Sequence, residues 1–235
     1  MISPTWTAVD DYLESHLIPD DDATAGALAA TRAAGLPDIA VSPTQGKLLE
    51  TYALLVRARR VLEFGTLGGY SAIWLARALP DDGRLITFEL DPHHAAVARA
   101  NLDAAGIGPK VDIRVGAAAD LIAGLDGEDP FDLTFIDADK AGNVGYFRAA
   151  LRHSRVGAVI VVDNVVRNGA IAAPSDDPGA AGSGCHRGGG ARGPGLRDGG
   201  ADGGPQGLRR VPRRRRHRLA RRYASLRALE RRGAR

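Results

Sequence analysis

The chain has 235 residues, a formal net charge of +3 and a single cysteine, Cys185. One cysteine excludes a disulfide framework and a zinc site built from several thiolates. No stretch approaches the roughly 18–20 apolar residues of a membrane-spanning helix, and residues 1–20 carry no apolar run of signal length, so we expect a cytoplasmic α/β protein.

The small net charge conceals two unlike compositions. Residues 180–235 contain 16 arginines, no lysine and three acidic residues, a formal charge of +13, which leaves −10 for residues 1–179. The basic segment is rich in glycine and has no Ile, Phe, Trp or Met, so it offers little apolar surface to offset the entropy cost of ordering. We therefore predict a folded domain over residues 1–179 and a disordered tail over residues 180–235.

Two interpretations of this tail stay open. It is either a basic extension that binds nucleic acid or membrane, or the product of a shifted reading frame. Every residue from 180 to 222 except Ser183 and Cys185 has codons beginning with G or C, as expected when the third positions of a GC-rich gene are read as first positions. Codons from His186 onward, read from the second nucleotide, can encode a string ending in KGFDGFRVAVVT. We favour a frameshift near residue 180, so nucleic acid is not the expected partner.

In chain order, Ala-rich spacing first predicts helix over residues 5–36. The next helix, to about residue 58, begins at Ser42-Pro43-Thr44-Gln45, with Ser42 as N-cap and Gln45 closing a capping box. Strands and helices then alternate. Strands are expected at residues 60–64, 84–90, 111–115, 131–136 and 158–162, and helices at 71–78, 92–105, 118–125 and 144–151.

This alternation predicts a doubly wound, mostly parallel sheet of the Rossmann-like type. The N-terminal helices occupy residues 1–58 and the Rossmann-like core residues 59–179.

The strongest local motif is VLEFGTLGGYS at residues 61–71, in which a strand ends in a glycine-rich turn that opens a helix. Glycine lets the backbone approach a nucleoside, and the helix start offers free N–H groups. Glu89 closes the next strand about 20 residues on, where a carboxylate can hold both ribose hydroxyls. Nicotinamide and S-adenosylmethionine sites share this pairing. Glu63 favours an S-adenosylmethionine site, because an acidic side chain suits a positively charged sulfonium or amine.

Polar residues also follow the fourth and fifth strands. Asp137-Ala138-Asp139-Lys140 ends one, and Asp163-Asn164 ends the other. Each could be a helix N-cap, but together, at the carboxyl ends of neighbouring strands, they favour a ligand site. Their oxygens suit Mg²⁺, Mn²⁺ or Ca²⁺, and Lys140 beside them suits a base. His93 and His94 are expected on the surface, and Tyr70 and Trp74 in helix packing.

Together these motifs resemble the class I S-adenosylmethionine-dependent O-methyltransferases that act on catechols and caffeoyl-coenzyme A. The resemblance covers about residues 38–177 and rests on SPTQGKLL, VLEFGTLGGYS, ITFELDP, FDLTFIDADK and VVDNVVRNG, in that order. It implies S-adenosyl-L-methionine and a divalent cation as cofactors, a phenolic or catechol acceptor, and a homodimer if the natural C-terminus is present. The shifted-frame string resembles the last two strands of that fold, which are then missing or scrambled here.

The same resemblance implies three groups of site residues. The expected catalytic residues are Lys140, as base, and Asp137. The expected metal ligands are Asp137, Asp163 and Asn164. The expected cofactor contacts are Val41, Ser42, Glu63, Gly65, Thr66, Gly69, Ser71, Glu89, Gly116, Ala117, Ala118 and Asp137.

Two other functional readings compete with an active methyltransferase. A nicotinamide-dependent oxidoreductase explains the glycine turn and Glu89, but leaves Asp137, Asp163 and Asn164 without a role. A methyltransferase-like protein that is impaired or inactive, because its C-terminus is altered, explains all of the motifs.

Overall fold

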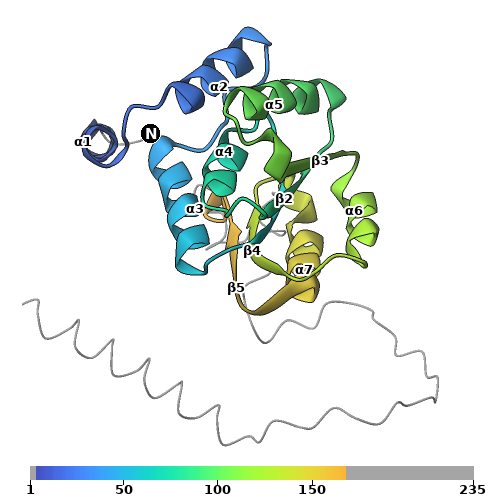
Figure 1. Cartoon of the computed structure of the whole chain (residues 1–235). Helices are drawn as coiled ribbons and strands as arrows, with labels where there is room; N and C mark the ends of the chain where they lie inside the picture. Colours follow the sequence, from blue (N-terminus) through green and yellow to red (C-terminus); the bar gives the residue numbers. More distant parts are fainter. Residues whose placement is uncertain (1–3, 168–235) are drawn as a thin grey trace, which may run out of the picture. The chain divides into compact units, whose positions relative to one another are not determined.

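The computed structural model describes residues 4–167, which form helices around one sheet (Figure 1). All neighbouring strands pair in parallel, in the order β3-β2-β1-β4-β5. The strands are β1 (Arg60–Phe64), β2 (Arg84–Glu89), β3 (Val111–Val115), β4 (Phe131–Ile136) and β5 (Ser154–Val162). The predicted Rossmann-like fold class is confirmed. The predicted loss of two final strands and the tail lie outside the described residues.

Within residues 4–167, each of the six expected helical segments contains a helix, but the first segment is divided. The expected helix over residues 5–36 is two helices, because Pro19 lies in the break and Asp21 caps the second one. The capping box at Ser42 and Gln45 is present. The helices are α1 (Pro4–Leu17), α2 (Asp22–Ala33), α3 (Pro43–Leu55), α4 (Tyr70–Arg77), α5 (Pro92–Ala104), α6 (Ala118–Leu121) and α7 (Asn143–His153).

Two further boundaries differ from the prediction. The expected helix over residues 118–125 is α6 followed by a 3₁₀ turn, η2 (Ile122–Leu125). Strand β5 begins four residues earlier than residue 158. Gly157, at φ +87°, accompanies a register shift between β4 and β5, so the pairing continues through a residue that the sequence pattern treats as a break.

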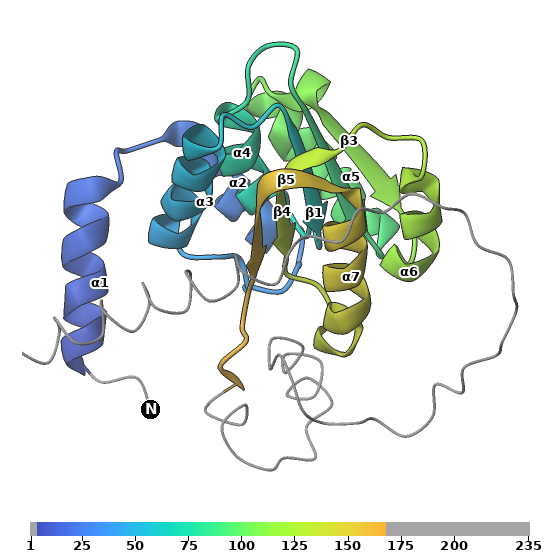
Figure 2. The same ribbon diagram turned by 90° about the horizontal axis from the view of Figure 1, so that it is seen from below.

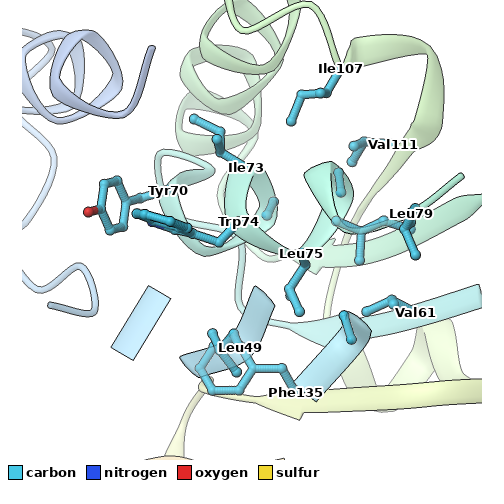
Figure 3. Close-up of a cluster of buried hydrophobic side chains, with 14 of the residues drawn as sticks. Leu49, Val61, Tyr70, Ile73, Trp74, Leu75, Leu79, Ile107, Val111 and Phe135 are labelled. Carbon is cyan, nitrogen blue, oxygen red and sulfur yellow. The ribbon is translucent and has the colours of Figure 1, made fainter. Parts of the chain in front are cut away.

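Alternate strand residues point to opposite faces of the sheet, and each face has its own apolar cluster. One cluster joins α3, α4 and α5 to the face that carries Val61 and Leu133; Figure 3 shows it around Trp74. The other joins α7 to the face that carries Leu62 and Phe64. Figure 2 shows α3 and α4 on one side of the sheet and α7 on the other.

The strand order reverses at β1, whose neighbours are β2 and β4. In an open parallel sheet the crevice beyond the carboxyl ends of the strands at such a point is the usual ligand site. The residues that follow β1, β2 and β4 are therefore brought together. Among residues 4–167, no helix is both long and apolar enough to cross a membrane.

Candidate active site

A cleft of about 710 Å³ lies at the carboxyl ends of the strands. Its wall includes the turn after β1, Glu89 at the end of β2, Asp137 after β4 and Asp163 after β5. Val41, from the loop before α3, lies on the same wall. Segments more than 100 residues apart in the chain thus meet at one opening.

The glycine turn after β1 is held by close backbone packing. Gly65 has φ +95°, and a Cβ there would lie 2.2 Å from the carbonyl oxygen of Asp137. A Cβ at Gly68 would lie 2.0 Å from the hydroxyl of Thr31. The Asn101 amide also donates to the Gly68 carbonyl oxygen at 2.9 Å. These positions need glycine because the neighbouring elements leave no room for a side chain.

Glu63 lies behind this turn and does not line the cleft. Its side chain is fully buried, and it accepts hydrogen bonds at 2.7 Å from the hydroxyls of Ser71 and Thr87. Thr66 lies 2.6 Å from the Thr87 hydroxyl and donates to it when the Thr87 proton is directed to Glu63. Burial raises the pKa of Glu63 to about 7. The expected direct contact between Glu63 and the cofactor is therefore not supported, because Glu63 does not line the cleft, whereas Ser71 and Thr66 do.

Glu89 links the second strand to the glycine turn. Its Oε2 atom accepts the backbone N–H groups of Thr66 at 3.2 Å and Leu67 at 2.7 Å, and its Oε1 atom accepts that of Asp91 at 3.0 Å. The side chain of Glu89 is 9% exposed and still lines the cleft. The Glu89 carboxylate and the glycine turn therefore hold each other in place.

His93 is exposed, as expected, whereas His94 is only partly exposed. Its Nδ1 atom lies 3.5 Å from the Glu89 carboxylate, and it lines the cleft, because the first turn of α5 faces back over the end of β2. Tyr70 also lines the cleft, in addition to packing at 6.3 Å from the Trp74 ring centroid. Sequence spacing from Glu89 could have indicated His94; nothing local indicated Tyr70.

The acidic end of the cleft joins the residues after β4 and β5. Lys140 Nζ lies 2.6 Å from Asp137 Oδ1, and both side chains line the cleft with Asp163 and Asn164. Burial raises the pKa of Asp163, and the nearby Asp137 raises it further. No group of three or more His, Cys, Asp or Glu side chains within residues 4–167 has the arrangement of a metal centre. The candidate ligand set is therefore two carboxylates and one amide.

The structure brings most of the predicted site residues to this cleft. Those that line it are Val41, Gly65, Thr66, Ser71, Glu89, Gly116, Ala117, Ala118, Asp137, Lys140, Asp163 and Asn164. Besides Glu63, two predicted cofactor contacts do not line it. Ser42 directs its hydroxyl to the start of α3, and Gly69 is the N-cap residue of α4 at φ +83°. Sequence reasoning also missed Thr31, Gln45 and Tyr146, which line the cleft from helices α2, α3 and α7.

Comparison with known proteins agrees with this geometry. A family model described as O-methyltransferase matches residues 22–182. Catechol O-methyltransferase of Mycobacterium tuberculosis is 57% identical over 169 residues, covering 72% of this chain and 76% of that protein. Catechol O-methyltransferase of Niastella koreensis is 50% identical over 173 residues, covering 73% and 78%.

Solved structures give the same result. The O-methyltransferase TomG from Streptomyces achromogenes, described as involved in tomaymycin synthesis, was crystallised in complex with S-adenosylmethionine. It superposes with a TM-score of 0.74 at 49% identity, covering 78% of this chain and 83% of that one. These matches favour methyl transfer over the nicotinamide-dependent oxidoreductase. This chain belongs to the family of S-adenosylmethionine-dependent O-methyltransferases.

Proposed function

We propose that this protein transfers the methyl group of S-adenosylmethionine to one hydroxyl of a catechol-type small molecule, with a divalent cation holding the acceptor. The observation that carries the proposal is the shared cleft, in which Asp137, Asp163, Asn164 and Lys140 lie beside the glycine turn. Two relatives at 50% identity or more are named catechol O-methyltransferases, which supports the same acceptor class.

For the cofactor, we assign the methionine part to the turn around Gly65, Thr66 and Ser71. When Glu63 is ionised it accepts the Ser71 proton, so the Ser71 hydroxyl presents lone pairs to the cleft. Such acceptors suit a positively charged ammonium or sulfonium. We assign the ribose to Glu89, and the adenine to the turn from Gly116 to Ala118.

For the cation, the donor set fits a hard divalent ion. Asp137 and Asp163 are close enough that Asp137 raises the pKa of Asp163, a repulsion that a bound cation would relieve. Asn164 adds a neutral oxygen, and all three line the cleft. Carboxylate and amide oxygens suit Mg²⁺, with Mn²⁺ or Ca²⁺ as alternatives. When bound there, such an ion would bind the vicinal oxygens of the acceptor and favour ionisation of its hydroxyl.

Lys140 is the proposed proton acceptor. In its neutral form, Nζ takes the hydroxyl proton while the acceptor oxygen forms its bond to the methyl carbon. The bond from sulfur to that carbon breaks, and its electron pair stays on sulfur. Asp137, 2.6 Å from Lys140 Nζ, then stabilises the ammonium that forms. The protein's contribution is mainly orientation and fixed charge.

The test is Asp137→Ala in the full chain, assayed with a catechol, S-adenosylmethionine and Mg²⁺. We expect kcat to fall by about 100-fold or more, because a preorganised charge at the reacting groups is lost. Calorimetric Mg²⁺ binding should be lost in parallel. Asp103→Ala is the matched control, because Asp103 lies on α5 outside the cleft. Full activity of wild type in a chelator would contradict the cation's role.

The homodimer and the cytoplasmic location stay predictions.

A further inference from the structure

A pair of residues that the motifs do not assign holds the loop between Asp137 and α7. The Tyr146 hydroxyl donates a hydrogen bond to Asp139 Oδ1. The second carboxylate oxygen of Asp139 accepts the backbone N–H of Gly142 at 2.8 Å. We call this pair the Asp139–Tyr146 clasp. It closes around Lys140, which is the residue next to Asp139.

The ring of Tyr146 is anchored in the core. Tyr146 is 6% exposed, and its ring stacks on that of Phe64, with centroids 4.9 Å apart. Phe64 is fully buried at the end of β1. A Cβ at Gly142 would lie 2.3 Å from the Tyr146 ring, so the loop can pass against that ring only because residue 142 is glycine. The clasp thus connects the loop to the centre of the sheet.

The hydrogen-bond polarity of the clasp excludes Tyr146 as the proton acceptor of the reaction. Both Asp139 oxygens act as acceptors, so the tyrosine hydroxyl must be the donor. Burial and the Asp139 carboxylate raise the pKa of Tyr146, which keeps its proton in place. The cleft nevertheless includes both side chains. The hydrogen bonds of the pair fix the backbone from which Lys140 extends, because they hold Asp139 before it and Gly142 after it.

We propose that Asp139 and Tyr146 are positioning residues for Lys140. By fixing the backbone on both sides of Lys140, the clasp keeps its Nζ atom 2.6 Å from Asp137 Oδ1, at the acceptor end of the cleft. The proposal rests on the proposed role of Lys140 as proton acceptor. The cofactor contacts proposed above, around Gly65, at Glu89 and from Gly116 to Ala118, follow β1, β2 and β3 and lie outside the clasped loop, so loss of the clasp should affect turnover and spare cofactor binding.

The test is Tyr146→Phe in the full chain, which removes one hydroxyl and keeps the ring against Phe64. We expect kcat for methylation of a catechol to fall by about 10-fold to 100-fold, the factor for losing a hydrogen bond to a charged group. The Kd of S-adenosylmethionine by calorimetry should stay within about twofold. Amide hydrogen exchange should accelerate in residues 137–145 and nowhere else. Tyr52→Phe is the matched control, since Tyr52 lies on α3 outside the cleft.

A double-mutant cycle tests whether the pair acts as a unit. Asp139→Asn should lower kcat as Tyr146→Phe does. The kcat of the double variant should be no lower than that of the less active single variant, because both substitutions break the same hydrogen bond. Unchanged exchange in residues 137–145, unchanged kcat, or exchange that accelerates throughout the chain would each overturn the proposal. If wild type does not methylate catechols, the proposed function fails, while loop exchange and cofactor affinity still test whether the clasp holds the loop.

Discussion

At the residue scale, Glu63 shows how a motif residue can serve a site that it does not touch. It is fully buried between β1, β2 and the start of α4, and Ser71 and Thr87 each donate to it. A buried carboxylate without a cation costs free energy, which explains why burial raises its pKa to about 7 despite two hydrogen bonds. In return, Glu63 orients the hydroxyl of Ser71, which lines the cleft.

This buried acid predicts a pH dependence of stability. The Glu63 pKa is raised in the folded state, so folding is progressively penalised as the pH rises from about 4.5, the unfolded value, to about 7. Above pH 7 the penalty is constant at about 3 kcal/mol. The side chain of Glu63→Gln cannot ionise. The free energy of unfolding of this variant, relative to that of wild type, should therefore be higher at pH 8 than at pH 5. Urea unfolding of the cofactor-free protein at both pH values measures this, and an equal difference at both would contradict it.

At the scale of elements, helix α2 holds the glycine turn from outside the sheet. Its Thr31 hydroxyl packs against Gly68, and Asn101 of α5 donates to the carbonyl oxygens of both Gly68 and Ala27. The other end of α2 is fixed by Asp21, which caps the helix and pairs with Arg77 of α4. The helix is therefore attached at one end to α4 and at the other to the glycine turn.

The Asp21–Arg77 pair predicts a second, opposite pH dependence. The hydrogen bond from Arg77 lowers the pKa of Asp21 to about 2, so its stabilisation is present above pH 3.8 and is lost as the pH falls towards 2. Asp21→Asn keeps a capping side chain but removes the charge. We expect it to lower the free energy of unfolding by about 1 kcal/mol at pH 7 and to have little effect near pH 2. If Asp21→Asn lowered the free energy of unfolding equally at pH 7 and pH 2, the effect would come from the helix cap and not from the charge pair.

At the scale of the whole molecule, we propose a domain over residues 1–179 and a frameshift-derived segment over residues 180–235. The supporting observation is the composition: 16 arginines and no lysine after residue 179, in a chain whose first 179 residues have a net charge of −10. The family model ends at residue 182, close to that boundary. If the cell produces the protein with this altered segment, the alternative that it is an impaired or inactive methyltransferase applies.

Sequencing the gene from its original DNA, across the codons for residues 166–222, tests this proposal. We expect one inserted or deleted base near codon 180, which restores a frame that ends in a KGFDGF-type segment. An unaltered sequence would contradict the frameshift. The basic segment would then be tested for nucleic-acid binding, which should weaken steeply with salt if arginines contact phosphates.

Sequence periodicity and turn chemistry were sufficient for the order of the elements and for most of the cleft. Gly65, Glu89, Asp137 and Asp163 each end or follow a strand, and the carboxyl ends of parallel strands meet at one edge. The helix start at Ser42 followed from its capping box. Boundaries were less accurate where a bulge or a short break, as at Gly157 and Pro19, gave no periodic signal.

The family, the parallel sheet and the chemical types gathered at its edge could therefore be predicted from the amino-acid sequence, because they depend on local patterns along the chain. Which side chains face the cleft was settled by tertiary packing. It placed Glu63 behind Ser71, brought His94 over Glu89, and joined Tyr146 to Asp139. These outcomes depend on how helices pack on the sheet, and the direction of a side chain relative to a distant segment leaves no mark in the residues beside it.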